Sequence, residues 1–124
     1  MKRFAKSATH ALRGILTAVV NERNVRIHCG IAVLAVILGF VLGISLIEWA
    51  LIIFAIGLVL SAELINTAVE HLADRVSRKH DLMIAKAKDT AAGGVLIAAL
   101  AAAAVGVLVL AVPAVKKAIE LVHR

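Results

Sequence analysis

Three long stretches of the chain carry no charged residue and are rich in apolar side chains. They cover residues 29–47, 49–62 and 91–112. A helix crosses the hydrocarbon layer of a membrane with about 20 residues, and the first and third stretches reach that length. The second is shorter, but the chain must return between the other two crossings, so its helix extends into the polar residues that follow. The pattern predicts membrane-spanning helices over 29–47, 49–76 and 91–112.

A capping box marks the start of the second predicted helix. Ser45 and Glu48 have the spacing at which the serine oxygen accepts from a backbone N–H while the glutamate reaches back to the serine N–H. Gly43 and Ile44 come just before this box and predict the turn between the first two spans. Gly39 and Gly43 also form a GxxxG motif, which favours the close approach of another helix.

Residues 1–21 repeat apolar side chains at helical spacing, with basic residues off that stripe. This pattern is typical of an amphipathic helix that lies in the plane of the lipid headgroups. We interpret it as a membrane anchor; the alternative is that some of its cations face an anionic ligand. Residues 114–124 follow Pro113 and predict a second short interfacial helix. The apolar stripe consists of Phe4, Ala8, Ala11, Leu12, Ile15, Leu16 and Val19.

The composition also indicates a membrane protein. Of 124 residues, 62% are hydrophobic and 18% are charged, whereas a soluble domain has about 45–50% apolar residues. A single domain, residues 1–124, is too short to bury such a surplus in its own core. A soluble monomer and a disordered chain are therefore excluded, and a disulfide scaffold is excluded because Cys29 is the single cysteine. We predict an all-α membrane protein with three transmembrane helices and an N-terminal amphipathic surface helix.

The distribution of Lys and Arg predicts the orientation. Six lie in residues 1–28, five in residues 63–90 and three after the third span, while the loop 44–48 has none. Cytoplasmic segments carry the excess of these residues, so we expect a cytoplasmic N-terminus and an external C-terminus. The net charge of +6 is then explained by the orientation of the chain in the membrane and by contact with lipid headgroups. No nucleic-acid partner is expected. The cations are Lys2, Arg3, Lys6, Arg13, Arg23, Arg26, Arg75, Arg78, Lys79, Lys86, Lys88, Lys116, Lys117 and Arg124.

Four polar side chains share one face of the second predicted helix. Glu63, Asn66, Glu70 and Asp74 fall within a narrow arc and extend over roughly 16 Å along the helix axis. Like charges so spaced repel, so packing alone gives little reason to align them. Glu63 directly follows the uncharged stretch, and carboxylates at the edge of a bilayer are costly and usually functional. For Glu70 and Asp74, an ordinary solvated helix face is the alternative.

Two further acids flank the same level of the membrane. Glu22 precedes the first span and Asp89 precedes the third, so both can converge with Glu63 and Glu70 at the cytoplasmic boundary. Carboxylate oxygens suit Mg²⁺, which usually shares its ligand shell with a substrate phosphate. The set predicts phosphoryl transfer, in which catalysis is mostly positioning and charge stabilisation. Three cations would neutralise the phosphate charge: Arg3, Lys6 and Lys88.

Other chemistries find less support in the sequence. It has no GxxxxGK[ST] loop, and its five histidines form no HExxH pair. Two interpretations from other classes stay open on these residues alone. One is a small proton-coupled transporter subunit in which Glu63 is the intramembrane protonation site. The other is a structural or regulatory membrane subunit without activity.

The segment from Glu63 to Arg75 resembles the signature of the prokaryotic diacylglycerol kinases, a family of small integral-membrane lipid kinases. Asn21-Glu22 before the first span and Ala87-Lys88-Asp89 before the third agree with the family in order and spacing. The resemblance covers essentially the whole chain. The matching signature reads Glu63-Leu64-Ile65-Asn66-Thr67-Ala68-Val69-Glu70, followed by Asp74-Arg75.

The resemblance implies a bacterial inner-membrane homotrimer with composite active sites at the cytoplasmic face. Lipid would enter from the bilayer and MgATP from the cytosol. Carried over by position, Glu63 would be the general base on the lipid hydroxyl, with Asn66 beside it, and Glu22 and Glu70 would hold Mg²⁺. Where family members often have an aromatic residue, this chain has His10. The implied nucleotide-binding residues are Arg3, Lys6, His10, Glu22, Asn66, Glu70, Asp74, Lys88 and Asp89.

The residues that follow Glu22 bear on the lipid substrate. Glu22-Arg23-Asn24-Val25-Arg26-Ile27-His28 is more similar to the undecaprenol kinase branch, which usually has Phe where Val25 stands. The diacylglycerol kinases more often have small apolar residues after this glutamate. The resemblance therefore implies ATP-dependent phosphorylation of undecaprenol, with diacylglycerol as the alternative substrate.

Overall fold

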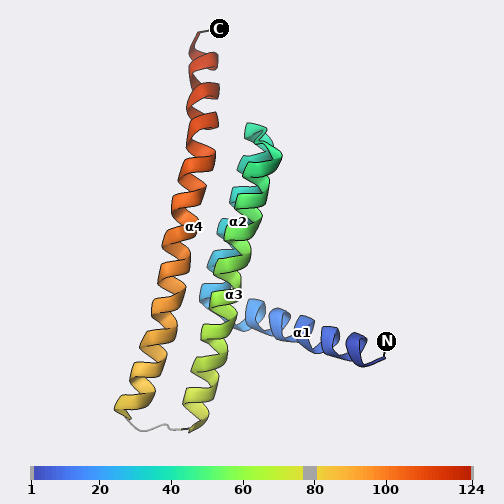
Figure 1. The fold of residues 1–124 in the computed structure, drawn as a ribbon, viewed down its shortest axis with the longest axis vertical. Helices are drawn as coiled ribbons and strands as arrows, with labels where there is room; N and C mark the ends of the chain where they lie inside the picture. Colours follow the sequence, from blue (N-terminus) through green and yellow to red (C-terminus); the bar gives the residue numbers. More distant parts are fainter. Residues whose placement is uncertain (1, 77–80, 124) are drawn as a thin grey trace.

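The computed structural model describes residues 2–76 and 81–123, which form four α-helices (Figure 1). Three of these helices are each long and apolar enough to cross a membrane, so the predicted all-α class with three such helices is confirmed. Met1, Arg78, Lys79, Arg124 and the side chain of Lys2, which entered the predictions above, lie outside the described residues. The helices are α1 (Lys2–Asn21), α2 (Arg23–Leu42), α3 (Leu46–Val76) and α4 (Leu82–Val122).

The three long helices run side by side, and α1 projects from them at a steep angle (Figure 1). α1 leaves the bundle where α2 begins, so its N-terminal end lies away from the other helices. Beyond that level α3 and α4 continue together without α2 beside them. The beginning of α2 therefore lies against the second half of α3, which contains the polar face predicted from the sequence.

A sharp junction joins α1 to α2. Glu22, the residue before α2, has an extended backbone (φ −98°, ψ 121°), and the chain changes direction there. The Arg26 guanidinium donates to the Val20 carbonyl oxygen at 2.6 Å, which satisfies an acceptor in the last turn of α1. Val25 is buried beside the junction. These contacts fix Glu22 at the start of α2.

The turn between α2 and α3 forms as predicted. The Ser45 N–H donates to Glu48 Oε2 at 2.7 Å, and the Glu48 N–H donates to Ser45 Oγ at 3.4 Å, so the capping box is confirmed. Gly43 ends α2 with a φ of 67°, a conformation that costs glycine no steric clash. This left-handed residue stops the helix at Leu42, so the uncharged stretch 29–47 is shared between α2 and α3.

Gly39 makes room for an aromatic ring from α3. A Cβ atom at this position would lie 2.8 Å from Cη2 of Trp49, and Gly39 is buried. The Trp49 ring also packs against Phe40, with ring centroids 4.7 Å apart. In the GxxxG motif, Gly39 thus makes room for the indole of Trp49, and Gly43 ends α2.

α4 continues through Pro113 to Val122, so the predicted separate helix over 114–124 is wrong. Proline removes one backbone hydrogen bond, and a helix among apolar neighbours tolerates that loss when the chain around it is held. Here the Lys117 ammonium donates to the Val41 carbonyl oxygen at 2.6 Å and ties the segment beyond the proline to the end of α2.

α4 also begins well before the predicted span 91–112. Asp81 precedes the helix, and its carboxylate accepts from the N–H groups of Met83 at 2.8 Å and Ile84 at 3.3 Å. Aspartate is a preferred N-cap residue because it satisfies N–H groups that have no partner within the helix. Lys88 and Asp89 therefore lie on the same helix as the third span, in the part that packs beside the end of α3.

Most large apolar side chains of the long helices are exposed in the single chain. Phe54 is 72% exposed and Leu108 is 75% exposed, whereas the buried apolar cluster is small and centres on Ile44, Ile52 and Val109. A soluble monomer rarely exposes contiguous apolar patches of this kind. Such a surface suits contact with lipid or with other copies of the chain.

Candidate active site

Glu63 is the buried carboxylate of the described residues, with its side chain 3% exposed. α3 places it where the uncharged stretch ends, on the side that faces α2. His28 of α2 lies opposite, with Nε2 3.6 Å from Glu63 Oε1. Because a buried carboxylate is costly without a partner, this contact is a specific feature of the α2–α3 interface.

Asn66 and Glu70 lie along the same side of α3. Asn66 Nδ2 donates to Glu70 Oε1 at 3.1 Å, and Asn66 is buried. Asn66 Oδ1 has no hydrogen-bond partner among the described residues. Buried acceptors are nearly always paired in native proteins. The amide oxygen is therefore available to a donor from outside the chain.

Glu22 contacts a histidine of α3. His71 Nε2 and Glu22 Oε1 lie 3.2 Å apart, and both side chains reach solvent. His71 directly follows Glu70, so the contact brings Glu22 beside the turn of α3 that carries Glu70. These two predicted metal ligands thus lie at a similar level, Glu70 on α3 and Glu22 at the junction between α1 and α2.

Asp74 and Lys88 connect α3 to α4 through an ion pair. Lys88 Nζ donates to Asp74 Oδ1 at 3.0 Å; the Asp74 side chain is exposed and that of Lys88 is partly exposed. Exposed pairs of this kind contribute little to stability, about 0–1 kcal/mol. Asp89, the next residue of α4, is exposed. The polar face of α3 therefore runs from the buried Glu63 to an exposed end, where Asp74 pairs with a cation from α4.

Three predicted site residues lie apart from this cluster. Arg3, Lys6 and His10 are exposed on α1, which points away from the other helices (Figure 1). The single chain does not bring them to Glu63. They share the direction of α1 and form a separate basic segment at the level where that helix leaves the bundle.

The predicted Mg²⁺ ligands do not form a closed metal site within one chain. Among residues 2–76 and 81–123, no three His, Cys, Asp or Glu side chains are placed to hold a metal ion. Glu22, Glu63 and Glu70 each contact a different neighbour, and Asp89 is exposed. The donor chemistry still fits Mg²⁺, which proteins commonly hold with one or two carboxylates while substrate phosphates complete the shell.

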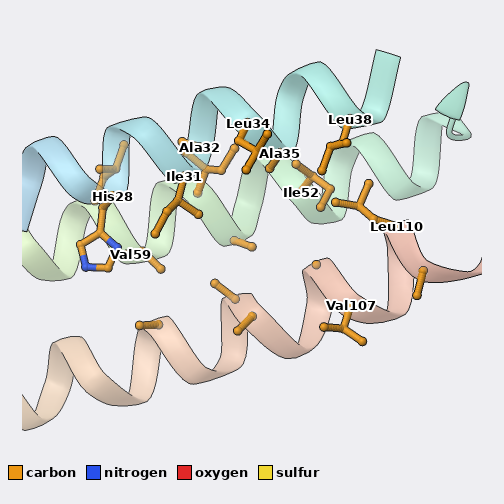
Figure 2. A pocket seen from close by; sticks show the side chains of 18 of the residues that line it. His28, Ile31, Ala32, Leu34, Ala35, Leu38, Ile52, Val59, Val107 and Leu110 are labelled. Atoms are coloured by element: carbon orange, nitrogen blue, oxygen red, sulfur yellow. The ribbon is translucent and has the colours of Figure 1, made fainter. Parts of the chain in front are cut away.

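An apolar cavity of about 630 Å³ lies between α2, α3 and α4 (Figure 2). Its lining consists of alanine, leucine, isoleucine and valine side chains, one glycine, and His28. Among the side chains labelled in Figure 2, only His28 carries nitrogen atoms. Since His28 also contacts Glu63, the cavity adjoins the buried carboxylate. The arrangement offers space for a hydrocarbon chain next to a buried carboxylate.

Comparison with known proteins assigns the family. The sequence pattern of the prokaryotic diacylglycerol kinases matches residues 9–110 of this chain. The chain belongs to that family. Its relatives include an undecaprenol kinase of Bacillus subtilis (strain 168), which is 41% identical over 109 residues covering 88% of this chain and 89% of the relative.

Other relatives are named diacylglycerol kinase. A diacylglycerol kinase of Haemophilus influenzae is 36% identical over 92 residues, 74% of this chain and 78% of the relative. A diacylglycerol kinase of Escherichia coli (strain K12) is 31% identical over 100 residues, 81% of this chain and 82% of the relative. The resemblance drawn from the signature around Glu63 is therefore confirmed.

Membership of the prokaryotic diacylglycerol kinases makes this chain a membrane-embedded lipid kinase that uses ATP. A kinase needs a phosphate-binding set and an alcohol-activating base at one level, which a proton relay does not need. The prediction of phosphoryl transfer is thus confirmed at the level of the family, and the transporter and inactive-subunit interpretations are set aside.

Two histidines contact the site and were not predicted as part of it. His28 faces Glu63, and His71 contacts Glu22. Neither histidine belongs to a metal-binding motif in the sequence. For His28 a signal was present, since it stands at the start of the uncharged stretch and therefore at the membrane level of Glu63. For His71 the sequence offers no such signal, because its contact with Glu22 joins residues that are 49 positions apart in the chain.

Proposed function

We propose that this lipid kinase phosphorylates undecaprenol at the cytoplasmic face of the membrane, giving the lipid phosphate and ADP. The observation that carries the proposal is the position of Glu63, whose carboxylate is buried beside an apolar cavity. The reacting hydroxyl of a lipid stays at the membrane boundary, so its base must stand there too. Diacylglycerol, which would give phosphatidic acid, is the second candidate substrate.

Two observations favour undecaprenol. The relative named undecaprenol kinase is 41% identical to this chain, whereas two relatives named diacylglycerol kinase are 36% and 31% identical. The segment 22–28, which resembles the undecaprenol kinase branch, also contributes His28 at the junction of cavity and carboxylate. Diacylglycerol remains a candidate because a site built for one lipid hydroxyl can admit another.

In the proposed reaction, Glu63 accepts the proton of the lipid hydroxyl while the hydroxyl oxygen attacks the γ-phosphorus of ATP. A bond forms between that oxygen and phosphorus, the bond to the β–γ bridging oxygen breaks, and ADP leaves with the electron pair. Burial keeps bulk water from Glu63, so the base acts on the lipid hydroxyl. The unpaired Oδ1 of Asn66 supports a role for this amide beside the substrate.

The nucleotide would approach from the solvent-exposed end of the α3 face. Lys88, now paired with Asp74, is accessible and could turn toward the phosphates, with Asp89 next to it. Glu22 and Glu70 would hold Mg²⁺ together with phosphate oxygens, and the ion would offset phosphate charge. The proximity of Glu22 to the α3 turn that carries Glu70 supports this assignment.

We also propose a homotrimer in which α1 of one copy serves the site of another. Arg3, Lys6 and His10 are exposed on a helix that points away from their own Glu63, so they would reach the nucleotide of a neighbouring copy. The exposed apolar surfaces of α2, α3 and α4 would supply the contact area. The N-terminus would lie in the cytoplasm and the C-terminus outside, in line with the distribution of Lys and Arg.

The test is phosphate transfer by the purified full-length protein in mixed micelles. Undecaprenol and diacylglycerol are offered separately with ATP labelled in the γ-phosphate and with Mg²⁺, and the lipid products are quantified. We expect both alcohols to be phosphorylated, with a higher kcat/KM for undecaprenol. A higher kcat/KM for diacylglycerol would overturn the choice of substrate, and no lipid product from folded protein would overturn the proposal.

A matched control keeps the assay specific. Glu120 is an exposed acid near the end of α4, far along the chain from the site. Glu120→Gln makes the same chemical change as a substitution of a site glutamate and should leave transfer unchanged. If Glu120→Gln reduced transfer as much as Glu63→Gln, the assay would be reporting general charge effects.

A further inference from the structure

His28 lies between the Glu63 carboxylate and the apolar cavity. Its Nε2 atom lies 3.6 Å from Glu63 Oε1, and its ring lines the apolar cavity (Figure 2). The His28 side chain is 20% exposed and that of Glu63 is 3% exposed, so the contact is shielded from water. The separation is slightly longer than a hydrogen bond and falls within the range of an ion pair.

The Glu63 carboxylate has few other means of orientation. Asn66, the nearby polar residue on the same face of α3, donates to Glu70 instead. Among the described residues, the side chain of His28 is the one that lies within ion-pair distance of Glu63. Either the protonated ring or the neutral ring with its proton on Nε2 presents a donor to the carboxylate. Without that donor, the carboxylate could rotate about its terminal torsion.

The backbone that carries His28 is well anchored. α2 begins at Arg23, five residues before His28, and the junction ahead of it is held by the contact between Arg26 and the Val20 carbonyl. Imidazole has two side-chain torsions, so fixing its ring costs little conformational entropy compared with fixing a longer side chain. A donor on a rigid helix is the arrangement that holds a reactive group in a productive geometry.

We propose that His28 is a positioning residue for the base: its Nε2–H orients the Glu63 carboxylate toward the alcohol that arrives through the apolar cavity. A lipid chain in the cavity would cover the same ring and remove the remaining water from the pair, which strengthens the interaction. The inference deepens the proposed function and rests on it, because it assumes that Glu63 is the base.

Two substitutions of His28 separate positioning from packing. His28→Leu keeps an apolar body of similar size but removes the donor. His28→Gln keeps an N–H near the place of Nε2. We expect His28→Leu to lower kcat roughly tenfold to a hundredfold, the scale of a misplaced catalytic group, while the KM for ATP stays within about twofold. His28→Gln should retain activity within about threefold of the unchanged protein.

His123 provides the matched control. It is an exposed histidine at the far end of α4, and His123→Leu should leave kcat and both KM values unchanged. Melting temperatures of all variants in the same detergent report packing. A purely structural role would predict equal losses in His28→Leu and His28→Gln together with lowered melting temperatures, and that result would overturn the inference.

The two proposals fail in different ways. If the unchanged protein phosphorylates no lipid alcohol, the proposed function is wrong and the kinetic comparison does not arise; the inference is then wrong with it. If the unchanged protein is active and His28→Leu keeps its kcat within about twofold, only the positioning role is overturned. An active protein with the expected split between the Leu and Gln variants supports both.

Discussion

At the scale of single residues, the site is a gradient from buried to exposed polar groups along one face of α3. Glu63 and Asn66 are buried, Glu70 is partly buried, and Asp74 reaches solvent. Abstraction of a proton from a lipid hydroxyl needs a base that is shielded from water. Binding of a nucleotide needs charged side chains that are accessible from the solvent. In the proposed reaction, the residues of one helix face would provide both, because they lie at successive depths.

Glu63→Gln tests the base directly. We expect kcat to fall by about 10²–10⁴-fold, the usual contribution of a general base, while binding of ATP changes little because the amide keeps the shape of the side chain. Turnover is measured by phosphate transfer, and nucleotide affinity by isothermal titration calorimetry on the same preparation. Loss of ATP affinity with normal turnover of the bound complex would contradict the assignment.

Glu70→Gln tests the metal role. An amide oxygen binds Mg²⁺ more weakly than a carboxylate because it lacks the charge, so the Mg²⁺ concentration for half-maximal rate should rise, by roughly 10-fold or more. The rate at saturating Mg²⁺ should recover in part. An unchanged Mg²⁺ dependence would leave Glu70 with a structural role, as the acceptor of the Asn66 amide.

At the scale of elements, the ends of the helices decide where site residues lie. The capping box of Ser45 and Glu48 starts α3, and Asp81 starts α4. Counting from these starts fixes the level of Glu63 on one helix and of Lys88 on the other. The close contact of Gly39 with Trp49 then sets how α2 sits against the first turn of α3.

Gly39→Ala tests that contact. An added Cβ would lie 2.8 Å from the Trp49 ring and 3.1 Å from Cδ1 of Ile44, so that either these side chains or the helices must move. We expect a loss of about 1–3 kcal/mol of stability, as is usual for overpacking, measured by unfolding in detergent. Gly30→Ala on the same helix meets no atom within 4 Å and should be neutral or stabilising by up to about 1 kcal/mol. Equal effects of the two substitutions would contradict this packing.

At the scale of the whole molecule, the direction of α1 is the main feature. α1, which carries Arg3 and Lys6, projects away from the three long helices (Figure 1). If copies exchange α1 helices between their sites, a site with an intact α1 from one chain and an intact Glu63 from another should work.

Mixed assemblies test this arrangement. Glu63→Gln and a variant with Arg3→Ala and Lys6→Ala would each be nearly inactive alone. Unfolding the two together in denaturing detergent and reconstituting them as a mixture should recover a substantial fraction of activity, because some sites combine intact parts. The comparison is the sum of the two separately reconstituted variants. Activity of the mixture no higher than that sum would place all site residues within one chain.

The sequence by itself determined the class of the protein, because uncharged stretches long enough to cross a bilayer leave few alternatives to helices. It also carried the resemblance to the family, through the signature from Glu63 to Arg75 and the motifs at Glu22 and Asp89, and comparison with known proteins confirmed that resemblance. Only the tertiary structure decided which side chains meet between helices: His28 opposite Glu63, and His71 opposite Glu22. Such contacts depend on the rotation and depth of each helix against its neighbour, which local sequence does not encode. The continuous α4 through Pro113 has the same origin, because the contact between Lys117 and the end of α2 comes from a distant part of the chain.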